Sequence, residues 1–334
     1  MTDVFETAPA GGVPLFDNPF DEAPLAAPPN PIQEEGGSRW MPHPETGVRT
    51  KFPRSSKYAG LWADEYVLNE WLIGMVTLGI GKTRGLYARA NAEPIPEEPM
   101  EDRPKGWWIP FNEIGHEAID AAEAKSGAHL GTAFHAWTEQ IEAGMRDLKS
   151  IPPEWRKHIQ AFMRMHEESG IQYVPEMREQ IIVNLDVHTG LCGRFDALRL
   201  DSFGRLVVDD TKTGKNAPMG LDEIAIQLAI YANATHIWAP GQPDSVNGYI
   251  PMPENVRKDV SMISWVPINA PEKAEIIPVD IRWGWEAAQR ISFTLAYRNR
   301  AKRIAGSRKG SLRLQASVLD SPDTLGPIGA IDKP

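Results

Sequence analysis

Two aspartates and a lysine occur in a pattern that could bind a metal ion and cleave a phosphate ester. Asp196 ends the run Gly-Arg-Phe-Asp, and Asp210 and Lys212 lie in the run Asp-Asp-Thr-Lys-Thr-Gly that follows across a predicted tight turn. If both runs are paired antiparallel strands, the two carboxylates can come close together. Because strand side chains alternate between faces, Asp210 and Lys212 point to one side. Asp209 points to the other side and is a weaker candidate.

The predicted metal ligands are these two carboxylates, a histidine and a backbone carbonyl. Mg²⁺ and Mn²⁺ prefer oxygen ligands in an octahedral shell, which Asp196, Asp210, the carbonyl of Thr211 and water could fill. His135 lies in a stretch of helical spacing with small neighbours and could complete the shell, although nitrogen suits Mn²⁺ better than Mg²⁺. Metal ions activate water and neutralise charge on a phosphate, and Lys212 could orient that water or neutralise further charge.

Three further residues are candidates for the same site. Gln227 and Tyr231 stand four residues apart on a predicted helix, so they share a face and could hold a phosphate. They could also simply pack at the edge of the core. Glu179 could bind the metal or pair with Arg178 or Arg194.

Each candidate also has an interpretation without chemistry. An Asp-x-Lys on a strand is ordinarily a solvated face, and a single helix histidine such as His135 is ordinarily a hydrogen-bonded residue. The ordered set of motifs is what favours a catalytic site. The segment Gly79 to Thr83 imitates part of a phosphate-binding loop, but it lacks the first glycine of that motif and a preceding strand, so ATP binding is not expected.

The elements that must position these residues change from helical to strand-like periodicity near residue 170. Apolar spacing predicts helices at 58–91 (with a break at 79–81), 117–125, 131–148 and 153–168. Short apolar runs then predict an antiparallel meander of strands at 179–186, 191–200 and 206–212. The remaining predicted elements are a helix at 221–238, strands at 248–250, 260–266 and 274–281, and a basic amphipathic helix at 285–304.

The expected fold class is α/β, with a central mixed β-sheet flanked by helices and an N-terminal helical cap. The four predicted segments are a disordered acidic and Pro-rich arm (1–37), the helical cap (38–126), the core with its basic C-terminal helix (127–306) and a disordered tail (307–334). Residues 1–38 contain seven carboxylates and no Lys or Arg, so much of the formal net charge of -10 belongs to the arm.

Composition excludes several classes of protein. The single cysteine, Cys192, cannot form an internal disulfide. No apolar run approaches the roughly 20 residues that span a bilayer, and the first residues lack the pattern of a secretory signal. We therefore expect a soluble, cytoplasmic protein without a membrane partner. With 42% apolar residues and 11 Trp, the chain can build a substantial core.

The C-terminal predicted helix could contact nucleic acid. Its cations could line a DNA path, and two tryptophans near its start could stack on bases, although basic residues at a helix end also simply favour the helix dipole. The residues concerned are Arg290, Arg298, Arg300, Lys302 and Arg303, with Trp283 and Trp285.

Taken together, the motifs resemble the RecB-type branch of the PD-(D/E)xK nuclease superfamily, which includes CRISPR-associated exonucleases and small phage-encoded relatives. The motifs of that branch are a helical His, a Glu, Gly-x-x-Asp, Asp-x-Lys-Thr-Gly and Gln-x-x-x-Tyr, represented here in order by His135, Glu179, Asp196, Asp210 with Lys212, and Gln227 with Tyr231. The resemblance covers about residues 127–240. It implies that His135, Asp196 and Asp210 are metal ligands and that Lys212 is the catalytic lysine.

The resemblance further implies a restriction-endonuclease-like core and a Mg²⁺- or Mn²⁺-dependent deoxyribonuclease. An exonuclease acting on single strands or duplex ends is favoured, in DNA recombination, repair or replication, and in the host cytoplasm if the protein is phage-encoded. CRISPR-associated members often hold an iron–sulfur cluster through four cysteines, and this chain has one cysteine, so no cluster is expected. The helicase module of larger relatives is missing, so any unwinding would need a separate partner, and a helicase or a recombinase is a candidate partner.

Two alternatives stay open at this point. A structure-specific endonuclease would use the same chemistry and differ only in the channel that admits DNA. A DNA-binding or recombination accessory protein could keep the fold without turnover, and it would show salt-sensitive DNA binding but no metal-dependent cleavage.

Overall fold

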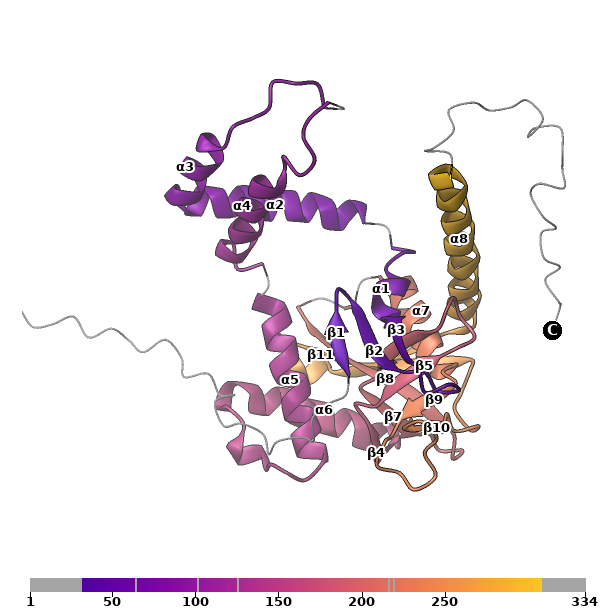
Figure 1. Ribbon diagram of the computed structural model, residues 1–334. Coiled ribbons are helices and arrows are strands. Elements are labelled where there is room, and N and C mark those ends of the chain that lie inside the picture. The colour runs from indigo at the N-terminus through magenta and orange to yellow at the C-terminus, as the bar shows by residue number, and fades with distance from the viewer. Residues whose placement is uncertain are drawn as a thin grey trace, which may run out of the picture.

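The computed structural model describes residues 32–63, 65–100, 102–124, 126–215, 217–218 and 220–307, and it shows a mixed α/β protein (Figure 1). Helices pack on both faces of a sheet that contains parallel and antiparallel strands. The expectation of an α/β fold around a mixed sheet is therefore confirmed. The parts of the predicted arm and tail that fall on residues 1–31 and 308–334 lie outside the described residues.

The central sheet has five strands in the order β12-β11-β8-β7-β4. They are β4 (Gln172–Arg178), β7 (Ala197–Leu200), β8 (Leu206–Gly214), β11 (Val260–Pro267) and β12 (Glu275–Asp280). β8 and β11 run parallel, whereas the other neighbours are antiparallel. β8 occupies the middle of the sheet, and its first six residues are buried because helices cover both faces.

The single strand predicted over 191–200 is wrong. It is divided into β6 (Leu191–Arg194) and β7, which belong to different sheets. The chain changes sheets at Asp196, whose carbonyl accepts a hydrogen bond from the backbone N–H of Glu179 (2.9 Å). Glu179 itself has a φ of 49°, which separates β4 from β5 (Ile181–Asn184). The predicted three-stranded meander is thus replaced by two hairpins, β5-β6 and β7-β8.

The helix predicted over 221–238 is shorter than expected. α7 (Leu221–Ala232) ends before Asn233, whose side-chain amide donates a hydrogen bond to the carbonyl of Ala229 (2.9 Å). Thr235 then pairs its backbone N–H with Val183 of β5 (3.0 Å), so the chain continues as β9 (His236–Trp238). The second sheet has the order β10-β9-β5-β6, with β10 at Tyr249–Pro251.

Helices form a layer on each face of the central sheet. α5 (Ser126–Glu142) and α6 (Pro153–Ser169) pack on one face around Phe134, Phe162 and Val266. α7 covers the other face, where Leu228 packs with Val208, and α8 (Arg282–Ser307) packs along α7. The predictions of helices at 153–168 and 285–304 agree with α6 and α8.

The N-terminal part differs from the prediction because it begins with strands. β1 (Gln33–Glu35), β2 (Ser38–Pro42) and β3 (Arg49–Pro53) form a small antiparallel sheet, followed by the short helix α1 (Ser55–Ala59). The disordered arm predicted over 1–37 is therefore wrong at residues 33–35, and the helical cap predicted over 38–126 begins with strands. Met41 and Phe52 of this sheet are fully buried against Cys192 and Tyr249, which explains its order.

The helical cap itself consists of α2 (Tyr66–Lys82), α3 (Arg84–Ala92) and α4 (Ile109–Ala121). It lies apart from the central sheet in Figure 1. The break predicted at Gly79 and Gly81 occurs instead at Thr83. Gly79 lies inside α2, at the point where that helix crosses α4. α2 is apolar and largely exposed, with Leu68, Trp71, Ile73 and Leu78 all at least 43% accessible.

No described helix combines the length and the apolar character that crossing a membrane requires.

Candidate active site

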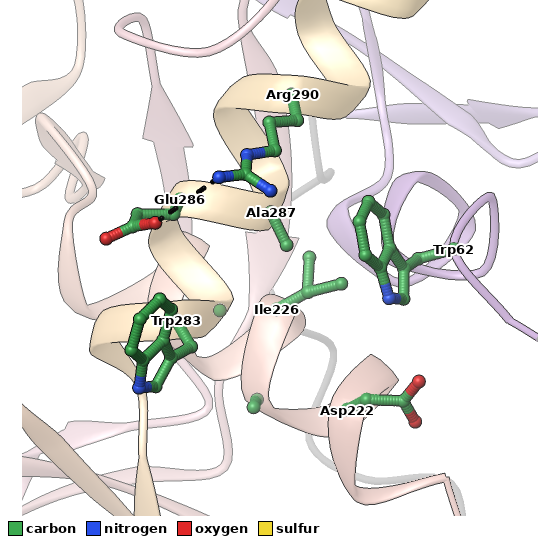
Figure 2. A pocket seen from close by; sticks show the side chains of 9 residues that line it. Trp62, Asp222, Ile226, Trp283, Glu286, Ala287 and Arg290 are labelled. Atoms are coloured by element: carbon green, nitrogen blue, oxygen red, sulfur yellow. Dashed lines mark ion pairs between the residues drawn. The ribbon is translucent and has the colours of Figure 1, made fainter.

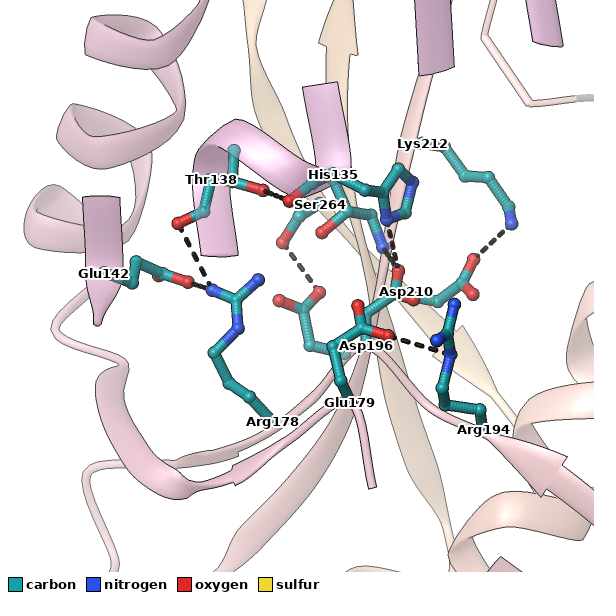
Figure 3. A network of polar contacts seen from close by, with 12 residues as sticks. His135, Thr138, Glu142, Arg178, Glu179, Arg194, Asp196, Asp210, Lys212 and Ser264 are labelled. Atoms are coloured by element: carbon teal, nitrogen blue, oxygen red, sulfur yellow. Dashed lines mark hydrogen bonds and ion pairs between the residues drawn. The ribbon is translucent and has the colours of Figure 1, made fainter. Parts of the chain in front are cut away.

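Four elements of the fold bring the predicted site residues to one place (Figure 3). α5 supplies His135, and β8 supplies Asp210 and Lys212. Asp196 and Glu179 come from the two irregular connections, between β6 and β7 and between β4 and β5. Because these connections leave the sheets at neighbouring points and are hydrogen-bonded to each other, their two carboxylates lie next to the centre of β8.

His135, Glu179 and Asp196 form a three-residue group of possible metal ligands. One ligand atom from each lies within 4.8 Å of the others, and His135 Nδ1 is 3.4 Å from Asp196 Oδ2. The backbone of Thr211 takes part as well. Its N–H donates to Asp196 Oδ2 (2.7 Å), and the Thr211 backbone also hydrogen-bonds to the His135 ring. Glu179, which the sequence offers as a metal ligand or as a partner of an arginine, therefore lies in the ligand group and also pairs with Arg194.

Asp210 lies beside this group rather than in it. Its Oδ2 is 2.7 Å from the Lys212 ammonium nitrogen, so the two side chains point to the same face of β8 as predicted. Asp210 is also close enough to act electrostatically on Asp196 and His135. The arrangement thus places three carboxylates, one imidazole and one ammonium group around a single point.

Burial and mutual repulsion perturb the acids of the group. The pKa of Asp196 is raised well above its ordinary value by burial, and the neighbouring carboxylates of Asp210 and Glu179 raise it further. The pKa of Glu179 is raised mainly by burial, although Arg194 opposes the shift from 2.9 Å. A divalent cation would relieve both effects, because it would neutralise charges that the fold has concentrated.

The histidine and the lysine are shifted in opposite directions. Burial lowers the pKa of His135, which favours the neutral imidazole that binds a metal. Burial also acts to lower the pKa of Lys212, but Asp210 outweighs it and the net pKa is raised. Lys212 is therefore an ammonium at neutral pH and serves as a positive charge. A donor set of two carboxylates and one neutral imidazole fits Mn²⁺ or Mg²⁺.

A buried polar network behind the site was missed from the sequence. Asp209 is fully buried on the opposite face of β8, where it accepts hydrogen bonds from Arg199 Nε (2.6 Å) and Ser264 Oγ (2.7 Å). Arg199 also donates to Glu142 of α5 (2.8 Å), which is itself paired with Arg178. Glu142 stands seven residues after His135, so it lies on the same face of α5, and that spacing could have identified it as an anchor.

Gln227 and Tyr231 lie together on α7, with Gln227 Nε2 donating to the Tyr231 hydroxyl (2.9 Å). Tyr231 is buried, and its pKa is raised by burial and by the charges of Asp210 and Asp196. Gly193 in the Gly-x-x-Asp motif is required here, since a Cβ at that position would lie 2.2 Å from Tyr231 Cε1. The predicted pair therefore adjoins the carboxylates, against the backbone that leads to Asp196.

The basic helix occupies a different part of the molecule from these acids. Arg290 and Trp283 line a cavity of about 210 Å³ between α7, α8 and Trp62 (Figure 2). Arg290 is 3.8 Å from Glu286, so part of its charge is already compensated. Trp285 is half-buried and packs against the core, so less of its ring is open to stacking than that of the exposed Trp283. Arg298 lines a neighbouring cavity, while the side chains of residues 302 and 303 lie outside the described part of the chain.

Comparison of the sequence with protein-family models gives no matching family, and comparison with curated proteins gives no significant match.

Proposed function

We propose that this protein is a divalent-metal-dependent DNA nuclease of the PD-(D/E)xK type, related to the RecB-type branch of that superfamily. One observation carries the proposal: His135, Glu179 and Asp196 converge within 4.8 Å beside the Asp210 and Lys212 pair. A structural ion-pair network would not be expected to leave buried carboxylates repelling one another, whereas a metal site would. The five motifs that resemble the family are also adjacent in space.

The residues of the chain have separable roles in this mechanism. His135, Glu179 and Asp196 would hold Mg²⁺ or Mn²⁺, with Asp210 and the backbone of Thr211 beside them. The bound ion supplies activation of water and neutralisation of phosphate charge. Lys212, an ammonium held by Asp210, stabilises negative charge that develops on the phosphate during in-line attack.

Other groups position the DNA strand. Gln227 and Tyr231 present an amide and a phenol beside the carboxylates, and Arg194 adds a guanidinium that is 2.9 Å from Glu179 and 56% exposed. Cations are needed because an overall charge of -10 repels DNA at long range. An exonuclease is the form we favour, for DNA ends arising in recombination, repair or replication.

The test uses purified protein with end-labelled linear and closed circular DNA, in Mg²⁺, Mn²⁺ or EDTA. We expect degradation of linear DNA only, complete loss in EDTA, and a loss of about 100-fold or more in rate for Lys212→Ala. Lys273→Ala is the matched control, because Lys273 is exposed in a turn between β11 and β12.

Three other results would change the proposal. Cutting of circles would indicate a structure-specific endonuclease. DNA binding without cleavage in any metal would indicate an accessory protein that keeps the fold. Full activity of Lys212→Ala would contradict the mechanism.

A further inference from the structure

A second group of cations surrounds a small cavity next to the candidate active site. The cavity, of about 160 Å³, is lined by Arg39, Arg54, Ser55, Ser56, Gly193, Arg194, Gln227 and Tyr231. These residues come from the N-terminal sheet, α1, β6 and α7, which are far apart in the sequence. We call this cavity the arginine pocket.

Two guanidinium nitrogens of the arginines that line the arginine pocket are buried without a hydrogen-bond acceptor. They are Nη1 of Arg39 and Nε of Arg54. Arg39 is only 8% exposed, so water satisfies it poorly, and a buried donor without a partner costs about 1–3 kcal/mol, more when charged. Its Nε atom is bound to Glu34 (3.0 Å), and Glu34 also lies 3.8 Å from Arg54 Nη1. One partly exposed carboxylate thus faces two arginines, which leaves an excess of positive charge at the pocket.

The size and charge of the pocket indicate a phosphate group. Cavities that enclose a whole drug-sized ligand measure roughly 300–1,000 Å³, so 160 Å³ suits a smaller group. Guanidinium forks bind phosphate through paired hydrogen bonds, and the Ser55 and Ser56 hydroxyls line the same cavity. A phosphate monoester carries about -1.5 to -2 charges at pH 7, more than the single charge of an internal phosphodiester, and it is joined to the chain at one side only.

The pocket also adjoins the candidate active site through shared residues. Arg194 lines the pocket and pairs with Glu179 of the ligand group (2.9 Å). Tyr231 lines it as well and lies near Asp196 and Asp210. A strand with its end in the pocket would therefore pass beside the carboxylates.

We propose that the arginine pocket binds the terminal phosphate of a DNA strand and so selects phosphorylated ends. This inference rests on the proposed function, because it concerns the end of the same DNA substrate. Glu34 is the internal competitor for Arg39 and Arg54, and removal of its charge should strengthen phosphate binding.

The test is equilibrium binding in EDTA, which is independent of cleavage. Internally labelled duplexes that carry a 5′-phosphate, a 3′-phosphate or only hydroxyl ends are titrated with the full-length protein, and fluorescence anisotropy gives Kd. We expect a duplex with one kind of phosphorylated end to bind about tenfold more tightly than the duplex with hydroxyl ends. The duplex that gains affinity identifies which end is recognised. Equal affinity for all three duplexes would overturn the inference.

Variants tie the preference to the pocket. Arg54→Gln should reduce the preference for a phosphorylated end to about twofold or less, whereas Glu34→Gln should increase it. Arg49→Gln is the control, because Arg49 is an exposed arginine of the same small sheet that binds Gln33 outside the pocket. Circular dichroism checks the fold of each variant. An unchanged preference in a folded Arg54→Gln protein would overturn the inference.

Failure of this inference and failure of the proposed function give different results. Metal-dependent cleavage without any preference for phosphorylated ends would contradict the role of the pocket and support the nuclease function. A preference in EDTA without cleavage in any metal would support the role of the pocket and contradict the nuclease function.

Discussion

Asp196 shows at the level of one residue how the fold sacrifices stability at the candidate site. Its side chain is 16% exposed and lies near the carboxylates of Asp210 and Glu179. The hydrogen bond from Thr211 stabilises the charged form, but burial and repulsion outweigh it, since the net pKa is raised. A carboxylate of this kind is expected where a cation binds.

Asp196→Asn should stabilise the metal-free protein at neutral pH by roughly 1–3 kcal/mol. Because the folded-state pKa is raised, the folded protein binds more protons than the unfolded chain above the ordinary pKa of 3.8. Stability of the wild type should therefore fall as pH rises through that window, and the fall should be smaller in the variant. Urea unfolding in EDTA from pH 4 to 8 measures this difference.

Metal binding should stabilise the wild type but not Asp196→Asn. Mn²⁺ should raise the Tm of the wild type more at pH 8 than at pH 5, because ligands must be deprotonated, and it should barely change the Tm of Asp196→Asn. Asp259→Asn is the control for the unfolding measurement. Arg257 lowers the pKa of Asp259 to about 2, so this substitution should not stabilise the protein against urea. An equal Mn²⁺ shift in wild type and Asp196→Asn would remove Asp196 from the ligand set.

At the scale of a single strand, β8 places two neighbouring aspartates in different surroundings. Asp210 faces Lys212 and the acids, whereas Asp209 faces Arg199 and Ser264 in the interior. Strand alternation alone allowed this division to be predicted. The identity of the buried partners could not be predicted, because Arg199 and Ser264 reach Asp209 from neighbouring strands.

Substitution of these two aspartates should therefore give opposite phenotypes. Asp209→Asn removes one of the two carboxylate charges that compensate the buried Arg199, and we expect a loss of about 3–5 kcal/mol in the free energy of unfolding. Asp210→Asn should change that free energy by less than about 1 kcal/mol and abolish cleavage. Denaturant unfolding and the nuclease assay measure the two effects. Similar stability losses in both variants would contradict the assignment of faces.

Elements with regular patterns were predictable, and elements set by long-range pairing were not. Helices α6 and α8 and strand β8 follow from apolar periodicity. The division of 191–200 into β6 and β7 depends on a change of sheet at Asp196, for which apolar alternation carries no signal. The motif residues could be chosen before the fold was known because each is tied to local spacing, whereas Arg39 and Arg54 reach the same region only through the small N-terminal sheet.

The crossing of α2 and α4 depends on a glycine rather than on a break in the helix. A Cβ at Gly79 would lie 1.9 Å from the carbonyl oxygen of Ala118. Gly79→Ala should therefore separate the two helices and increase hydrogen exchange in both, with little change in the central sheet. Gly74→Ala is the matched control, since nothing lies within 4 Å of its Cβ and alanine favours the helix by about 1 kcal/mol. Unchanged exchange in Gly79→Ala would show that the cap does not depend on this contact.

On the scale of the whole molecule, cations must be concentrated locally for an acidic protein to bind DNA. The formal net charge is -10, and several arginines are already paired, such as the exposed Arg282 with Asp280 (2.5 Å) and the half-buried Arg257 with Asp259 (2.6 Å). The arginine pocket brings three guanidinium groups to the neighbourhood of the candidate active site. We therefore propose a DNA path over this face rather than along α8, because Arg194 of the pocket adjoins the carboxylates of the candidate site.

The salt dependence of DNA binding distinguishes these two paths. If a phosphate contacts Arg194, Arg194→Gln should reduce the slope of log K against log salt by about 0.9 for duplex DNA, because one fewer counterion is released. Arg290→Gln should leave the slope unchanged, since Arg290 lies at the cavity between α7 and α8 and faces Glu286. Both variants remove one charge, so a general electrostatic effect would alter the two slopes equally. Loss of slope only in Arg290→Gln would place the DNA along α8 and would separate the arginine pocket from the bound strand.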